Sequence, residues 1–121
     1  MIRIDSMDLP YLELADVGQA EIGAKVLALA YTTPPNEIGM ISGVVSDLKV
    51  DAGRNIRWLE IDVRLGREYD GGPALNLYGE VAGVVDTKTI SGAPNSAGLV
   101  IASNTVNVYL ERLTAGEIIV N

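Results

Sequence analysis

Short apolar or alternating segments, separated by turn-forming residues, run along most of the chain. Residues 24–31 form an apolar run that ends at residues 32–36, whose Thr-Thr-Pro-Pro-Asn sequence strongly interrupts regular structure. Apolar residues alternate with small or polar ones over residues 37–50 and over residues 55–63, and the loop between these runs contains Gly53. Two such runs joined by a short glycine-containing loop predict a β-hairpin. A second hairpin is predicted from residues 74–77 and 80–86, and one more strand from residues 97–102.

One helix is predicted, over residues 103–114. Ser103 or Asn104 can cap its start, because a short polar side chain accepts a hydrogen bond from the free amides of the first turn. Arg112 falls in the last turn, where the helix dipole favours a cation, and Gly116 suits the left-handed residue after the end. Apolar residues recur at helical spacing between these ends, at Val106, at Tyr109 or Leu110, and at Leu113.

Several short strands followed by a single helix are typical of a β-barrel or a β-sandwich. The predicted fold class is therefore all-β, and a length of 121 residues fits one domain, residues 1–121. The apolar runs are much shorter than the roughly 18–20 residues of a membrane-spanning helix, so no membrane span is expected. Residues 1–5 lack the apolar run of a secretory signal, and any such signal would lie upstream of Met1.

Composition excludes several classes of function. The chain contains no histidine and no cysteine, so it has neither the usual general base of a nucleophilic hydrolase nor the usual ligands of a zinc enzyme. Its net charge of −7 would repel a polyanion, which argues against nucleic-acid binding. Hydrophobic residues make up 48% of the chain and 13 further residues are glycine, an apolar share above that of an ordinary globular domain.

The sequence Asp70-Gly71-Gly72-Pro73 lies between two predicted strands. Two glycines followed by a proline indicate a tight turn at which the backbone approaches another group closely. On physical grounds alone this segment is a hairpin loop.

The residues around this turn resemble the nucleophile loop of trypsin-like serine proteases of the HtrA/Deg type. That family has Gly-Asn-Ser-Gly-Gly-Pro, then a short strand, Gly-Glu/Gln-Val and a Gly-Ile/Val strand. The matching positions here are Gly71-Gly72-Pro73, Leu75-Asn76-Leu77, Gly79-Glu80-Val81 and Gly83-Val84. Three further segments resemble other parts of the same domain: residues 23–29 (GAKVLAL), 42–46 (SGVVS) and 98–106 (GLVIASNTV).

This resemblance implies a six-stranded antiparallel β-barrel of trypsin-like type, one half of the double barrel, with a C-terminal helix. It also implies that the catalytic positions are degenerate. Asp70 occupies the position of the nucleophilic serine, and Glu68 replaces the glycine whose amide helps to form the oxyanion hole. Tyr69 stands where the family has asparagine. The family's catalytic His and Asp lie on the preceding barrel, and residues 2–5 resemble the sequence just after that Asp.

Other polar residues were weighed as candidate sites. Four carboxylates within eleven residues suit either a hard cation, which prefers oxygen ligands, or a glycosidase-like pair, although Arg64 and Arg67 lie among them and can neutralise them. These acids are Glu60, Asp62, Glu68 and Asp70. Without a histidine or a suitably placed lysine, Thr87, Ser91 and Ser96 are expected to be surface hydroxyls, and Trp58 is expected in the core.

The function expected from these observations is that of a catalytically inactive trypsin-like domain that acts in protein or peptide binding or in association. No catalytic residue, metal or cofactor is expected. The alternative is the C-terminal part of a larger HtrA/Deg-like serine peptidase chain, present without the barrel that bears His and Asp. An enzyme of an unrelated kind ranks third.

The expected partner is a protein, either a complementary barrel or a second copy. In the double-barrel proteases one face of the C-terminal barrel packs against the N-terminal barrel, and loss of that partner uncovers an apolar face. We therefore predict a homodimer, with residues 68–70 near its interface but not central to it, because like charges from two copies repel. Location is not determined by the residues; the family resemblance suggests an extracytoplasmic one.

Overall fold

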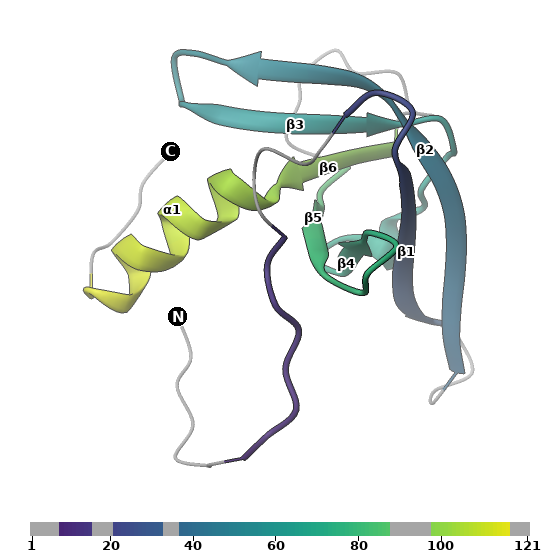
Figure 1. Cartoon of the computed structure of the whole chain (residues 1–121), viewed down its shortest axis with the longest axis horizontal. Coiled ribbons are helices and arrows are strands. Elements are labelled where there is room, and N and C mark those ends of the chain that lie inside the picture. Colours follow the sequence, from purple (N-terminus) through teal and green to yellow (C-terminus); the bar gives the residue numbers. More distant parts are fainter. Residues whose placement is uncertain (1–7, 16–20, 33–36, 88–97, 117–121) are drawn as a thin grey trace.

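The computed structural model describes residues 8–15, 21–32, 37–87 and 98–116. Strands and one main helix follow each other along the chain (Figure 1). The elements are β1 (Lys25–Thr32), β2 (Glu37–Asp51), β3 (Ile56–Ile61), the short 3-10 helix η2 (Arg67–Tyr69), β4 (Pro73–Leu75), β5 (Val81–Val85), β6 (Gly98–Ala102) and α1 (Ser103–Thr114). Within this described part, no helix is long and apolar enough to cross a membrane.

The strands form a closed antiparallel barrel in the order β1-β2-β3-β6-β5-β4. The ring places the β1–β4 pair on the opposite side from the β3–β6 pair. Closure leaves no strand edge free to pair with another chain over the paired positions. The all-β class and the six-stranded barrel predicted from the sequence are therefore confirmed.

The strand β2 is long enough to pair with two neighbouring strands. Its first half pairs with β1, from Thr32 opposite Glu37 to Lys25 opposite Val44. After a register shift between Val45 and Asp47, its second half pairs with β3. Such a bulge bends the strand and lets the barrel turn a corner. The predicted hairpin of residues 37–50 and 55–63 is confirmed, as is the shorter one formed by β4 and β5.

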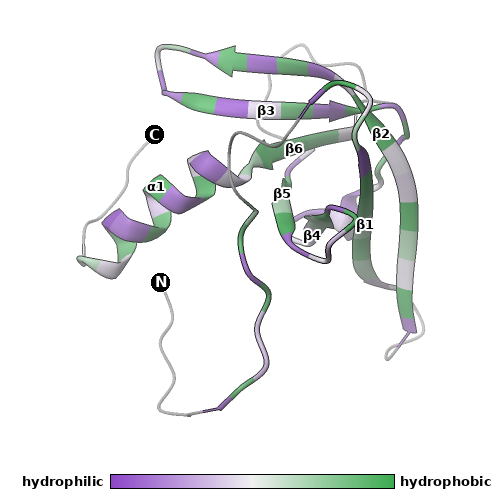
Figure 2. Cartoon of the chain, viewed as in Figure 1, coloured by the Kyte–Doolittle hydropathy of each residue, from purple (hydrophilic) through white to green (hydrophobic). Residues whose placement is uncertain are grey.

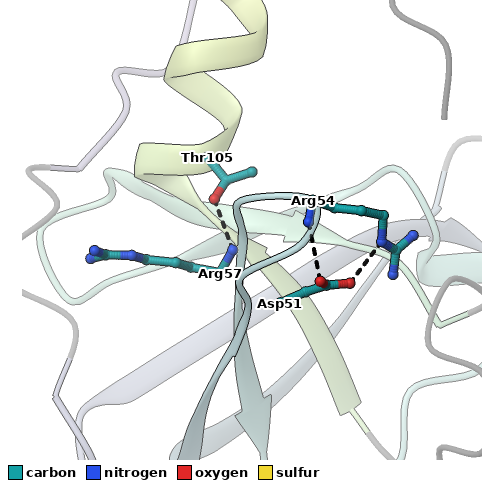
Figure 3. Close-up of polar contacts among 4 residues, drawn as sticks. All are labelled: Asp51, Arg54, Arg57 and Thr105. Carbon is teal, nitrogen blue, oxygen red and sulfur yellow. Dashed lines mark hydrogen bonds and ion pairs between the residues drawn. The ribbon is translucent and has the colours of Figure 1, made fainter.

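The tip of the β2–β3 hairpin is held by one side chain (Figure 3). The Asp51 carboxylate accepts hydrogen bonds from the Arg54 backbone N–H at 3.2 Å and from its Nε at 2.7 Å. The Arg54 guanidinium, through this hydrogen bond, lowers the pKa of the Asp51 carboxyl from its ordinary value. Beyond the tip, the Arg57 N–H donates to the Thr105 hydroxyl at 3.0 Å, which ties β3 to the first turn of α1.

The interior of the barrel is a continuous apolar core. Every strand contributes to it, and Ala28 and Ala74 are almost fully buried where β1 and β4 approach each other. Small side chains at these positions let a narrow barrel fill its interior without voids. The buried residues of this core are Val26, Ala28, Val45, Leu59, Ile61, Leu65, Tyr69, Ala74, Ala82, Val85, Val100 and Ala102.

A second core lies outside the barrel, between α1 and the outer face of β3 and β6. Trp58 is 2% exposed and packs there with Ile56 and Leu99. Ile101 and the helix residue Tyr109 pack against this cluster. The expectation that Trp58 is a core residue is confirmed, and α1 is the element that buries it.

The limits of α1 match the predicted residues 103–114, and the Asn104 Oδ1 accepts a hydrogen bond from the Thr105 N–H of the first turn at 2.9 Å, but the N-cap residue is neither Ser103 nor Asn104. The N-cap residue is Ala102, which makes no side-chain cap, because β6 runs directly into the helix and leaves no polar residue between them. Ser103 lies inside the first turn and donates its hydroxyl to the Ala15 carbonyl at 3.1 Å. The C-terminal signals are confirmed: Arg112 is in the last turn and Gly116 has a φ of 83°.

Removing the Trp58 side chain should unfold the domain more easily than removing an exposed aromatic one. We expect Trp58→Ala to lower the free energy of unfolding by about 3–5 kcal/mol, since it empties the core beneath α1. Tyr78, which is 88% exposed, provides the control, and Tyr78→Ala should change stability by less than about 0.5 kcal/mol. Urea denaturation followed by circular dichroism measures both; equal losses would contradict this account of the second core.

Candidate functional site

The candidate site is the loop between β3 and β4, whose middle is the short helix η2. Two apolar residues anchor it: Leu65 before the helix and Tyr69 at its end, 4% and 5% exposed respectively. Both belong to the interior core. Since buried Tyr69 follows exposed Glu68 and precedes half-buried Asp70, the core contact presents the two carboxylates on the outer side of the loop.

The two glycines after Asp70 let the loop pass against β1. Gly71 has a φ of 81°, a left-handed conformation that glycine adopts without strain. A Cβ atom at Gly72 would collide with the Leu29 carbonyl oxygen of β1. The predicted close approach is therefore confirmed, and the group approached is the backbone of β1. Backbone hydrogen bonds from Gly71 N to Val85 O (2.8 Å) and from Val85 N to Gly72 O (2.9 Å) attach the turn to β5.

Among the described residues, the Asp70 carboxylate is hydrogen-bonded to Thr87. Its Oδ1 accepts from the Thr87 backbone N–H at 2.9 Å. The Thr87 hydroxyl lies 2.9 Å from Oδ1 and 3.1 Å from Oδ2, within donating distance of both. The expectation that Thr87 is a surface hydroxyl is therefore wrong, because the residue is half-buried and its hydroxyl is bonded. Ser91 and Ser96, which were grouped with it, lie outside the described residues.

The register of the β4–β5 hairpin explains this contact. Pro73 lies opposite Val84, so continuing the pairing outward by three positions brings Asp70 opposite Thr87. The bond between Asp70 and Thr87 was missed from the sequence, although the predicted hairpin contains the signal that would have found it.

Glu68 differs from the half-buried Asp70 because its side chain is exposed and folds back over Gly66. A Cβ atom at Gly66 would collide with both oxygens of the Glu68 carboxylate. The loop thus carries two acidic side chains, one bonded within the fold and one facing solvent.

The other two acids of the sequence cluster belong to strand contacts. Glu60 pairs with Lys49 across β2 and β3 at 2.9 Å, and this contact raises the pKa of the Lys49 amine. Asp62 accepts a hydrogen bond from the Val44 N–H at 2.8 Å, beside the bulge of β2. Lys49, rather than Arg64 or Arg67, is the cation that pairs with this cluster among the described residues.

The geometry does not favour a metal centre here. Residues 8–15, 21–32, 37–87 and 98–116 hold no group of three or more His, Cys, Asp or Glu side chains that could bind an ion. The site consists of a tight turn with the Asp70 carboxylate at its apex, hydrogen-bonded to Thr87.

Comparison with known proteins assigns the chain to a family. The family model of the trypsin-like peptidase domain matches residues 1–84, a span that contains the loop from Glu68 to Pro73. The chain belongs to the trypsin-like peptidase domain family. The resemblance of the Asp70-Gly71-Gly72-Pro73 segment to the nucleophile loop of such proteases thus rests on a family-level match.

A solved structure agrees with the family. The crystal structure of the serine endoprotease from Yersinia pestis superposes with a TM-score of 0.70 at 22% sequence identity, over 92% of this chain and 38% of that one. At this identity the likeness shows the trypsin-like fold, and this chain spans little more than a third of the endoprotease's length. No curated protein matches the chain.

The hydrogen bonds between Asp70 and Thr87 should stabilise the fold, and their contributions should be coupled. We expect Asp70→Ala to cost about 1–3 kcal/mol of unfolding free energy, since it removes a carboxylate that accepts from both an N–H and a hydroxyl. Thr87→Val removes only the hydroxyl and should cost less.

A double-mutant cycle in urea denaturation measures the coupling. If the two side chains interact as described, Asp70→Ala with Thr87→Val should cost less than the sum of the two single changes. Strict additivity would show that Asp70 contributes to stability through some other contact.

Proposed function

We propose that this trypsin-like domain is catalytically inactive and acts by binding protein, including a second copy of itself. The observation that carries the proposal is the state of Asp70, which occupies the position of the family's nucleophile and has both carboxylate oxygens within hydrogen-bond distance of Thr87. A carboxylate held in this way is not converted by a base into an alkoxide-like nucleophile.

Two further features support inactivity. Histidine is absent from all 121 residues, so no imidazole is present in this chain to accept the proton of a nucleophile. Glu68 adds a negative charge to the loop at the position where the family has the oxyanion-hole glycine. An acyl-transfer transition state needs hydrogen-bond donors around a developing negative charge, and a carboxylate beside it opposes that stabilisation.

The alternative proposal is that the chain is the C-terminal part of a larger HtrA/Deg-like peptidase. It is favoured by the coverage, since the chain matches 38% of the Yersinia serine endoprotease. A companion barrel would supply His and Asp, but Asp70 would still leave the assembled site without a hydroxyl nucleophile. An upstream open reading frame that encodes a barrel with those two residues would support this alternative.

The chain should not cleave protein, and restoring the hydroxyl should not change this. We expect no hydrolysis of casein by the wild-type chain or by Asp70→Ser, because the variant gains a nucleophile but no general base and keeps Glu68 in the loop. Release of fluorescence from labelled casein measures activity, with trypsin as the positive control and a mock purification as background. Circular dichroism establishes that Asp70→Ser is folded. Cleavage above background by the wild-type chain would overturn the proposal, whereas cleavage by the folded variant alone would contradict the expectation that the missing base and Glu68 also prevent activity.

The chain should self-associate in solution. We expect a mass of about twice 12.8 kDa by light scattering coupled to gel filtration, as for a two-fold dimer, the commonest form of homo-oligomer. A mass that stays near 12.8 kDa across a wide range of concentrations would contradict association while leaving the question of activity to the casein assay.

A further inference from the structure

One outer face of the barrel is apolar and uncovered in the described structure. In β1, Val26 and Ala28 point into the core, so the alternate residues Leu27, Leu29 and Tyr31 face outward. Their partners on β2 are Ser42, Met40 and Ile38. Figure 2 shows hydrophobic positions along both strands, on the side of the molecule away from α1. We call this surface, together with Leu75 and Leu77 beside β1, the β1–β2–β4 face.

The opposite side of the barrel differs from this face because a helix packs against it. There, α1 covers the outer face of β3 and β6 and reduces the exposure of Trp58 to 2%. On the β1–β2–β4 face, by comparison, four apolar side chains remain 60–78% exposed. These are Tyr31 (75%), Ile38 (60%), Met40 (65%) and Leu77 (78%).

The face is large enough for a dimer contact. Strand pairing makes it continuous, since Leu29 lies opposite Met40 and Leu27 lies between Ser42 and Leu75. Its four most exposed side chains, at roughly 100 Å² of apolar surface each, offer on the order of 400 Å², the size of the largest and often functional apolar patch of a typical protein, about 300–600 Å². With a polar rim this approaches the roughly 800 Å² that each partner of a standard interface buries.

The two ends of the face differ in shape. At the Lys25 end a groove of about 490 Å³ is open to solvent, with Leu27, Val44 and Leu77 among its walls. At the other end Tyr31 projects as a 75% exposed aromatic side chain. Six residues of extended strand, about 20 Å, separate Lys25 from Tyr31. At protein interfaces, an exposed aromatic side chain often serves as an anchor that fills an apolar pocket of the partner.

We propose that a second copy of this chain docks on the β1–β2–β4 face, with the two β1 strands antiparallel and Tyr31 of each copy inserted in the groove of the other. The two-fold axis then passes near Leu29 and Met40, and each tyrosine meets the partner's groove beside Lys25. Lys25, the charged side chain among the groove residues, thereby lies next to an aromatic ring, with which a cation interacts favourably. The opposite ends of the interface keep the two lysines apart.

This inference rests on the proposed self-association and adds the surface that mediates it. Sedimentation equilibrium of the full chain gives the dissociation constant of the dimer for wild type and variants. Tyr31→Ala removes the anchor, and its control is Tyr11→Ala, at an 81% exposed tyrosine outside the face. Ile38→Glu places a charge in the interface, and its control is Val50→Glu, on the same strand at a similar exposure of 65%.

We expect Tyr31→Ala and Ile38→Glu each to raise the dissociation constant at least about tenfold, and each control to change it by less than about twofold. Lys25→Ala should weaken the wild-type dimer but have little further effect in Tyr31→Ala, because the two side chains meet across the interface. All variants should keep the wild-type far-ultraviolet circular dichroism spectrum.

The outcomes separate the two proposals. A dimer that Tyr31→Ala and Ile38→Glu leave intact would overturn the assigned surface while supporting self-association. A chain that is monomeric at all concentrations would overturn both the surface and self-association, whereas catalytic inactivity is judged independently by the casein assay.

Discussion

The closure of the barrel between β1 and β4 is the constraint on which the rest of the structure depends. Two residue pairs join these strands, Leu27 with Leu75 and Ala28 with Ala74. Gly72 extends the contact, because its lack of a side chain lets the loop lie against the carbonyl of Leu29. The short strand β4 closes the barrel only if it lies close to β1. Ala28, Ala74 and Gly72 allow this close approach because their side chains are small or absent.

This constraint accounts for the shape of the loop from Asp70 to Pro73 without any reference to catalysis. Gly71, Gly72 and Pro73 shape the turn and start β4, and these tasks are independent of catalysis. Asp70 lies at the apex of the turn, and its carboxylate bonds to Thr87. This bond continues the β4–β5 pairing by one more contact, so Asp70 has a structural role whether or not it takes the place of a nucleophile.

The extent to which the sequence predicts this structure differs from element to element. The alternation on both sides of Gly53 sufficed for the β2–β3 hairpin, and the spacing after Ser103 sufficed for the limits of α1, because both patterns are local. The N-cap position was mispredicted, because β6 runs directly into the helix at Ala102, and the Ser103 hydroxyl bonds to the Ala15 carbonyl, 88 residues away in sequence. At the candidate site the family resemblance located Asp70 and Glu68, but Thr87 and Lys49 acquire their partners through strand register, which composition and motif spacing do not report.

The strand β1 has apolar residues on the face toward the core and on the face toward solvent. A strand with one solvated face, by contrast, alternates between apolar and polar residues. Its inward residues, Val26 and Ala28, are accounted for by the core. Its outward residues make no such contact, yet Tyr31 and Leu29 offer the kind of surface that α1 buries on the far side. Because burial of apolar area is the main source of stability for a chain of this size, a strand that is apolar on both faces is most stable when both are covered. The same eight residues thus close the barrel on one side and present the proposed docking surface on the other.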